Sequence, residues 1–213
     1  MINVFLVDDH ALVRTGIRRI LEDERGIKVV GEVADGEQAV SWCRKNMVDV
    51  VVMDMSMPGI GGLEATRKIL HFNPDAKVII LTVHTEEPIP SRVMAAGAAG
   101  FLTKNAPPAD MVQAIRAVAS GQRYIDPVIA QQMALRPFNP DKNPFDELSD
   151  RELQITMMVT NGQKVSDIAE QLNISPKTVN AYRYRLFDKL KIGGDVELTR
   201  LAIRYGMLDA EKI

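Results

Sequence analysis

The sequence predicts an α/β domain built on a parallel sheet, followed by a small all-α domain. Short apolar runs alternate with longer segments of helical periodicity over roughly the first 120 residues, a pattern typical of parallel sheets that are covered by helices on both faces. The stretch Arg136–Asp146 then carries three prolines, which block helix continuation. Beyond Glu147 every periodic segment is helical, so the architecture changes across a proline-rich linker.

Five apolar runs are expected to form the strands of the sheet. The run Val48–Met53 is almost wholly apolar, as expected for a strand that is buried on both faces. Right-handed crossovers leave few topologies, and five strands favour the flavodoxin-like order 2-1-3-4-5. The predicted strands are Ile2–Val7, Lys28–Val33, Val48–Met53, Lys77–Val83 and Gly100–Thr103. The helices between and after them are predicted over Ala11–Leu21, Glu37–Lys45, Leu63–Leu70, Ser91–Ala96 and Ala109–Ala119.

Two prolines stand where the fourth of these helices would begin. The residues before Pro88 and Pro90 are disfavoured in the helical conformation. We therefore expect a fourth helix that starts late and is mobile.

The domain organisation follows from these patterns. We expect an α/β domain over residues 1–123, a helix (Asp126–Leu135) and proline-rich linker over 124–146, and an all-α domain over 147–213. In the last of these, Ser149 and Glu152 have the spacing of a capping box at a helix that runs to about Thr160. Further helices are expected over Val165–Leu172, Lys177–Leu190 and Asp195–Tyr205.

Composition excludes several classes of protein. A single cysteine, Cys43, rules out a disulfide within the chain and argues against a zinc cluster. No apolar run approaches the roughly 20 residues that span a bilayer, and no signal peptide opens the chain, so we expect a cytoplasmic protein without a membrane partner. The net charge of −2 hides one basic stretch, residues 173–191, with five basic residues and one acid, which indicates a polyanion partner there.

Polar side chains collect where the predicted strands end. Asp8 and Asp9 follow the first strand and Asp54 the third, while Thr82 and Lys104 lie at the ends of the fourth and fifth. Ligands of open parallel sheets bind at this edge. Three close carboxylates call for a divalent cation, and all-oxygen ligands suit Mg²⁺. A carboxylate can also accept a phosphoryl group as a nucleophile, with the lysine and the hydroxyl contacting that group.

A simpler interpretation applies to each of these residues alone. A lone aspartate at a strand end is usually a turn former or a helix cap, and Asp9 could simply cap the first helix. That interpretation does not account for four strand ends that together hold three acids, a hydroxyl and a lysine.

These residues, together with Pro58-Gly59, resemble the signature of the receiver domains of two-component response regulators, over about residues 1–120. The resemblance implies that Asp54 is the phospho-acceptor, and that Asp8, Asp9 and the Ser56 carbonyl bind Mg²⁺ with it. It also implies that Thr82 and Lys104 contact the phosphoryl group. Phe101 occupies the family's aromatic switch position, where its switching would be steric, although a core aromatic is an equally good interpretation.

The second domain carries the pattern of a helix-turn-helix. Two short helices flank a tight turn at Asn173-Ile174, and the second, capped by Ser175 with Pro176 at its first position, is basic. Such a recognition helix enters the major groove of double-stranded DNA. A basic helical face can also be only a solvated surface.

The segment LSDRE…VSDIAEQLNISPKTVNAYRYRLFDKL resembles the DNA-binding domain of the LuxR/NarL/FixJ family, over about residues 147–208, and is most similar to the GacA/UvrY/SirA/VarA subfamily. The resemblance implies a BarA/GacS-type hybrid histidine kinase as partner and activation of small regulatory RNAs that sequester a CsrA/RsmA-type translational repressor. Aligned on the family motif, the base-facing residues are Asn180, Ala181 and Tyr184, and Tyr182 replaces the usual His. The candidate phosphate contacts are Lys177, Thr178, Arg183, Arg185 and Lys189.

The resulting hypothesis is a non-enzymatic, phosphorylation-controlled switch. In the resting state the receiver domain covers the recognition helix, and phosphorylation releases it, so that two chains pair through Asp195–Tyr205 on a two-fold DNA site. Autodephosphorylation would be its only, slow, chemistry. One rival is a Mg²⁺-dependent phosphatase, which would need a cap insertion and a second acid where Ser56 stands. The other is a regulator whose receiver no longer signals by phosphate.

Overall fold

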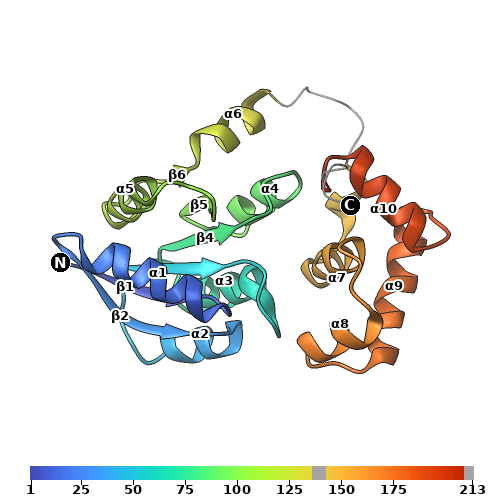
Figure 1. Ribbon diagram of the computed structural model, residues 1–213, viewed down its shortest axis with the longest axis horizontal. Coiled ribbons are helices and arrows are strands. Elements are labelled where there is room, and N and C mark those ends of the chain that lie inside the picture. The colour runs from blue at the N-terminus through green and yellow to red at the C-terminus, as the bar shows by residue number, and fades with distance from the viewer. Residues whose placement is uncertain (136–142, 209–213) are drawn as a thin grey trace. The chain divides into compact units, whose positions relative to one another are not determined.

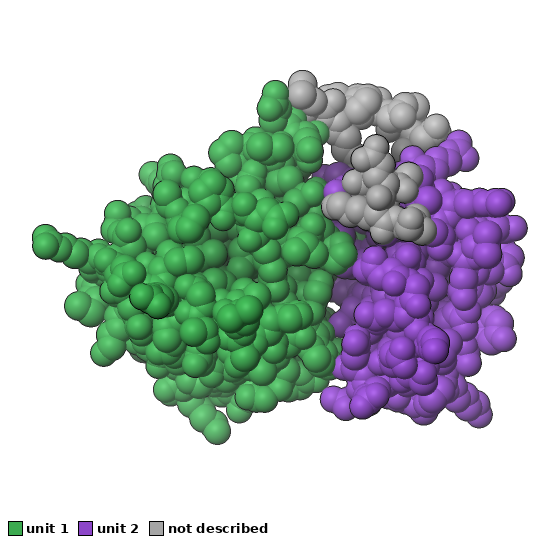
Figure 2. Space-filling view, viewed as in Figure 1, with its two compact units in different colours: residues 1–85, 90–135 green, residues 86–89, 136–213 purple. Residues whose placement is uncertain are grey.

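The computed structural model describes residues 1–135 and 143–208 (Figure 1). The chain divides into two compact units, coloured separately in Figure 2. One comprises residues 1–85 and 90–135, and the other comprises residues 86–89 and the chain beyond residue 135.

The first unit is built on a parallel sheet with the strand order β2-β1-β3-β4-β5-β6. The expected order 2-1-3-4-5 is confirmed, but the expected number of five strands is wrong. The additional strand β6 (Tyr124–Ile125) pairs with β5 in parallel, at Gly100 and Phe101. Two residues are too few to show a period, so no sequence pattern marks this strand. The other strands are β1 (Ile2–Val7), β2 (Ile27–Val33), β3 (Val50–Asp54), β4 (Val78–Thr82) and β5 (Gly100–Thr103).

Helices cover the sheet on both faces, as the alternating pattern predicts (Figure 1). Ile17 and Leu21 of α1 (Ala11–Glu22) and Ile115 of α5 (Pro108–Ala119) pack in one buried cluster with Val4 and alternate residues of the other strands. The opposite side of β1 carries Phe5, whose ring stacks at 3.9 Å on the ring of Trp42. Trp42 belongs to α2 (Gly36–Cys43), which packs beside α3 (Gly61–Phe72).

The fourth helix departs from expectation at its start. Helix α4 spans Ile89–Ala95, so it begins two residues before the expected Ser91. Pro90 stands at the second position of the helix, where the N–H that proline lacks has no acceptor within the helix in any case. The helix is short, with 7 residues against 12 in α3. Its expected mobility stays a prediction.

Residues 124–135, expected outside the α/β domain, lie with the first unit, where β6 leads into α6 (Pro127–Leu135). The linker Arg136–Asp146 falls largely outside the described residues, since these resume at Asn143. The domain boundaries that we inferred from the sequence stay a prediction.

The second unit is helical throughout its described part. A 3-10 helix, η1 (Pro144–Glu147), leads into α7 (Asp150–Thr160), and the remaining helices are α8 (Val165–Gln171), α9 (Pro176–Leu190) and α10 (Asp195–Arg204). The expected capping box of Ser149 and Glu152 is present, and Ser175 caps α9. In the described part of the chain, no helix has both the length and the apolarity that a bilayer crossing requires.

An ion pair between a buried carboxylate and an exposed lysine connects α9 to the start of α7. The carboxylate of Glu152 accepts hydrogen bonds from Lys189 Nζ at 2.7 Å and from the Ser149 N–H at 2.8 Å. Burial raises the pKa of Glu152, but these hydrogen bonds and the Lys189 charge lower it by more, so the net shift is downward. The ionised carboxylate therefore stabilises this unit at neutral pH.

We expect Glu152→Gln to lower the free energy of unfolding of the second unit by about 1–3 kcal/mol at neutral pH, because the hydrogen bonds of a buried carboxylate with charged Lys189 and with the Ser149 N–H are weakened. The pKa of Glu152 is lower in the folded state, so its contribution is lost as pH falls from the ordinary 4.5 through the lowered pKa. Denaturant titrations followed by far-ultraviolet circular dichroism should show the difference shrinking in acid. Glu170→Gln, at an exposed position of α8, serves as control. A difference independent of pH would contradict the ion-pair account.

Candidate functional site

Sheet topology brings the predicted acids together. Strands β1 and β3 are neighbours, and Val7 pairs with Met53, so Asp8 and Asp54 follow directly on adjacent strands. Both aspartates are buried, with about 2% of each residue exposed. Ligand atoms of Asp8, Asp9, His10 and Asp54 all lie within 4.8 Å of one another. The sequence predicted the three acids of this cluster but not His10.

Lys104 is the counter-charge of the two buried acids. Its Nζ lies 2.7 Å from Asp8 Oδ2 and 3.0 Å from Asp54 Oδ2. Burial lowers the pKa of Lys104, but the two carboxylates raise it by more, so the ammonium stays charged. The expected placement of Lys104 beside the acids is what the structure shows.

Asp54 is held in an unfavourable environment for a charged carboxylate. Burial raises its pKa, Lys104 lowers it and Asp8 raises it again, with a net shift from 3.8 to about 6. Its Oδ1 accepts a 3.3 Å hydrogen bond from the Ser56 N–H, while the buried Oδ2 makes no hydrogen bond of regular geometry. Asp54 is therefore a carboxylate poised to gain from a further cation or from covalent modification.

The donor set fits Mg²⁺. Three carboxylates offer oxygen ligands, which Mg²⁺ prefers, and the under-satisfied Asp54 Oδ2 is an oxygen that a cation would stabilise. Asp8, Asp9 and Asp54 are the residues that would hold the ion. Ser56 follows Asp54 in the loop after β3, and its expected role through the backbone carbonyl stays a prediction.

The two predicted switch residues lie on the neighbouring strands β4 and β5. Thr82 ends β4, which pairs with β3 so that Asp54 is opposite Leu81. Thr82 is buried and its Oγ1 accepts a 3.0 Å hydrogen bond from the His84 N–H. Phe101 of β5 is fully buried, so its ring is part of the core in this conformation. Its role as a steric switch stays a prediction.

Arg14 and Gly62 also contribute to the site, although the sequence analysis did not predict them. Arg14 of α1 donates a hydrogen bond from Nη1 to the Asp8 carbonyl and so fixes the end of β1. Gly62 of α3 lies against the end of β3, and a Cβ there would stand 2.0 Å from the Asp54 carbonyl oxygen. Its N–H donates a 3.0 Å hydrogen bond to the Met55 carbonyl. Only glycine permits this approach, and the pair Gly61-Gly62 after Pro58-Gly59 is the signal that could have revealed it.

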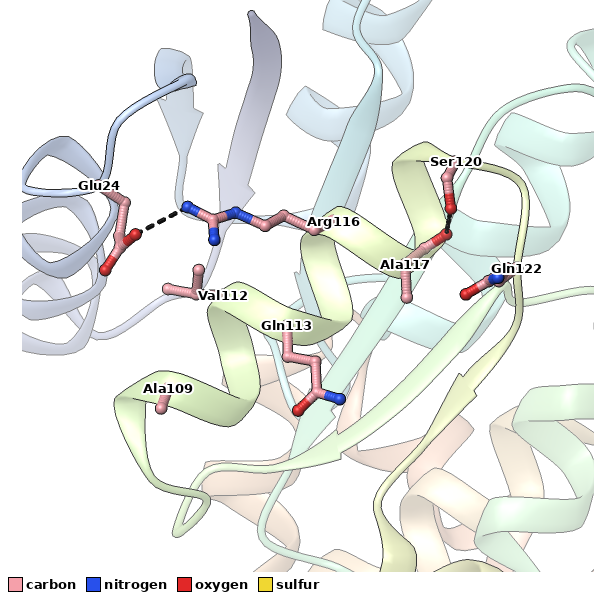
Figure 3. A pocket seen from close by; sticks show the side chains of 8 residues that line it. All are labelled: Glu24, Ala109, Val112, Gln113, Arg116, Ala117, Ser120 and Gln122. Atoms are coloured by element: carbon pink, nitrogen blue, oxygen red, sulfur yellow. Dashed lines mark hydrogen bonds and ion pairs between the residues drawn. The ribbon is translucent and has the colours of Figure 1, made fainter.

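A surface hollow on α5 is lined by different residues from those of the acidic site. It has a volume of about 560 Å³ and is lined by α5, by residues just after it and by Glu24, and none of the predicted site residues lines it (Figure 3). Arg116 spans it to reach Glu24 at 2.8 Å. The hollow is open, and its two charged lining residues, Glu24 and Arg116, pair with each other.

Helix α9 is the predicted recognition helix, and the residues that were predicted to contact DNA differ in their exposure along it. Lys177, Ala181, Tyr184 and Arg185 are exposed, and Tyr184 retains 71% of its surface. The Thr178 hydroxyl is engaged with the capping Ser175 at 2.8 Å. The Arg185 guanidinium lies 4.4 Å from the centre of the Tyr182 ring.

Two predicted phosphate contacts already have acidic partners within the domain. Lys189 pairs with Glu152 at 2.7 Å, and Arg183 pairs with Asp195 at the start of α10. Asn180 is half-buried and accepts a 2.8 Å hydrogen bond from Arg183 Nη1. The sequence did not reveal Asp195 as part of this surface. Contacts of these residues with DNA stay predictions.

Comparison with known proteins covers nearly the whole chain. Residues 4–116 match the response regulator receiver domain, and residues 146–202 match the bacterial regulatory proteins of the luxR family. The chain is 67% identical over 215 residues to the response regulator UvrY of Escherichia coli, covering 100% of this chain and 99% of that protein. It is 57% identical over 212 residues to the response regulator GacA of Pseudomonas aeruginosa, covering 99% of each.

A solved structure has the same two-part organisation. RcsB from Salmonella enterica serovar Typhimurium, bound to the promoter P1flhDC in the presence of the phosphomimetic BeF₃⁻, superposes with a TM-score of 0.69 at 27% identity, over 94% of this chain and 97% of that one. The receiver match covers the acidic site and the luxR match covers α9. The chain therefore belongs to the two-component response regulators that join a receiver domain to a DNA-binding domain of the LuxR type.

Proposed function

We propose that phosphorylation of Asp54 controls sequence-specific DNA binding by this chain and thereby transcription. The observation that carries the proposal is the cluster of Asp8, Asp54 and Lys104, in which one ammonium lies within 3.0 Å of two buried carboxylates. Such a cluster has no structural need to be charged, since buried ion pairs contribute little net stability. Lys104 places a positive charge 3.0 Å from the Asp54 carboxylate, where it would pair with an anionic group attached to Asp54.

The chemistry proceeds by attack of an Asp54 carboxylate oxygen on phosphorus. The O–P bond forms as the P–N bond of a kinase phosphohistidine breaks, and the electron pair leaves with the imidazole. A Mg²⁺ ion held by Asp8, Asp9 and Asp54 would neutralise charge on the carboxylates and on the phosphoryl oxygens. Lys104, already beside Asp54, pairs with the new phosphoryl charge, and the Thr82 hydroxyl turns to hydrogen-bond a phosphoryl oxygen.

The DNA-binding side of the proposal depends on α9. Its exposed face carries Lys177, Ala181, Tyr184 and Arg185, and helices of this kind place their N-terminal residues at base edges in the major groove. The RcsB structure was solved with promoter DNA and a phosphoryl mimic, which supports the same pairing of signals in this chain.

The finer identity of the partners rests on the relatives UvrY and GacA. We propose a BarA/GacS-type hybrid histidine kinase as phosphodonor and genes of small regulatory RNAs as targets. A homodimer on a two-fold site, paired through α10, completes the proposal. The receiver holds the phosphoryl group and does not act as an enzyme on other molecules.

Acetyl phosphate with Mg²⁺ tests the phosphorylation step. We expect the wild-type chain to incorporate one phosphoryl group, measured by intact mass and by its lability to hydroxylamine. Asp54→Asn should incorporate none, because the amide is a poor nucleophile, and chelation of Mg²⁺ should suppress incorporation in wild type. Undiminished incorporation in Asp54→Asn would rule out Asp54 as the acceptor.

A further inference from the structure

The side chain of Arg183 forms hydrogen bonds with two residues of its own domain, Asp195 and Asn180. Nε lies 3.2 Å from Asp195 Oδ1, and Nη2 donates to Asp195 Oδ2. This is a bidentate arrangement of a guanidinium on a carboxylate, the strong and directional form of the pair. Only 21% of the Arg183 side chain is exposed.

The charge of Arg183 is therefore compensated before any DNA arrives. A phosphate that approached this guanidinium would compete with a carboxylate already in place and would be repelled by it. Arg185 differs, because it is exposed and its guanidinium stacks on the ring of Tyr182. Two arginines two positions apart on α9 thus have different electrostatic environments.

The guanidinium nitrogen of Arg183 that does not contact Asp195, Nη1, fixes the orientation of the Asn180 side-chain amide. Nη1 lies 2.8 Å from a side-chain atom of Asn180. Every guanidinium nitrogen is a donor, so the atom that faces it must be the acceptor Oδ1, and Nδ2 must lie on the other side of the amide. Asn180 is one turn before the exposed Tyr184 and next to the exposed Ala181. Asp195 and Arg183 therefore form a relay: Asp195 orients Arg183, and Arg183 orients the Asn180 amide so that its Nδ2 donor remains available.

We propose that Asp195 and Arg183 are positioning residues for base selection, which lock the amide of Asn180 in one orientation toward the major groove. The inference rests on the proposed sequence-specific DNA binding. With Oδ1 occupied by Arg183, the group presented to a base is the Nδ2 donor. In the major groove adenine, guanine and thymine each offer an acceptor, whereas cytosine offers only a donor. Asn180 therefore disfavours cytosine at the base that it contacts, and Arg183 sets this preference without binding phosphate.

Selection from a random DNA pool with the full-length chain, beryllofluoride and Mg²⁺ tests the relay. Asn180→Ala first marks the base position that this residue reads. Arg183→Met should then relax the exclusion of cytosine at that position by about fivefold or more, since the amide is free to turn. Its salt dependence of binding should match that of wild type. Asp195→Ala should relax the same position while steepening the slope of log K against log salt by up to about one, because Arg183 becomes available to a phosphate.

Arg185→Met is the matched control, with the same change of side chain two residues away on the same helix. It should weaken binding to all sequences alike and reduce the salt slope by about one. Unchanged preference at the marked position in both Arg183→Met and Asp195→Ala would overturn the relay. So would an Arg183→Met variant that behaves like Arg185→Met. If the wild-type chain selects no site, the proposed DNA-binding function is wrong. If the wild-type chain selects a site and the variants keep its base preference, only the relay is wrong.

Discussion

Replacing Asp54 by Asn should stabilise the metal-free protein at neutral pH. The pKa of Asp54 is about 6 in the folded state against 3.8 ordinarily, so the folded state binds the proton more tightly than the unfolded state. Ionisation of Asp54 therefore destabilises the fold as pH rises between these two values, and the penalty is complete above pH 6. A difference of about two pKa units corresponds to about 3 kcal/mol, which the neutral amide avoids.

Trp42, the only tryptophan, gives the readout, because it stacks on Phe5 inside the first unit. Urea titrations in chelator, followed by Trp42 fluorescence, should show the full gain in stability for Asp54→Asn at about pH 8 and roughly half of it at about pH 5. Mg²⁺ should reduce the gain by stabilising wild type alone.

Asp126→Asn is the control, since Asp126 is also buried but accepts a hydrogen bond from the Val128 N–H at 2.9 Å. It should not stabilise the protein at either pH. A gain for Asp54→Asn that is independent of pH, or a loss at neutral pH, would contradict the account of a carboxylate held in its unfavourable form.

Gly62→Ala should destabilise the first unit by at least about 3 kcal/mol and impair phosphorylation of Asp54. The new Cβ would lie 2.0 Å from the Asp54 carbonyl oxygen and 2.9 Å from the Met55 Cα. These neighbours are backbone atoms, so no side chain can rotate away. Either α3 moves from the sheet or the end of β3 shifts, and a shift there displaces Asp54 from Lys104.

The comparison is Gly16→Ala, inside α1, where an added Cβ meets nothing within 4 Å. That change should be neutral or stabilise the protein by up to about 1 kcal/mol, because alanine favours the helix. Trp42 fluorescence in urea measures stability, and acetyl phosphate incorporation measures the acceptor. A Gly62→Ala protein that matched Gly16→Ala in both measurements would show that the approach of α3 to β3 is not restrictive.

Most of the sheet and the acidic cluster could be predicted because each carries a local signal. Apolar runs such as Val50–Met53 mark buried strands, and a charged residue at the end of such a run, as at Asp54, is conspicuous. Topology then assembles residues as distant as Asp8 and Lys104. The helical caps of Ser149 and Ser175 were likewise readable from residue type and spacing.

The features that escaped prediction depend on tertiary contacts. Strand β6 exists only because Tyr124 and Ile125 meet the open edge of β5, and their own sequence has no period. The ion pair of Arg183 and Asp195 joins two helices across a turn, and no local sequence pattern indicates that these two residues pair. Helix α4 starts at Ile89 because proline is tolerated in the first turn of a helix, where Pro90 lies. The prediction of a later start considered only the restriction on the residue before each proline.

The most direct test of phosphorylation control is DNA selection from a random pool with and without beryllofluoride and Mg²⁺. The phosphoryl mimic should enrich a two-fold site in the wild-type chain, and Asp54→Asn should show no response to it. Enrichment that is equal with and without the mimic, or a response that survives in Asp54→Asn, would contradict control of DNA binding through Asp54.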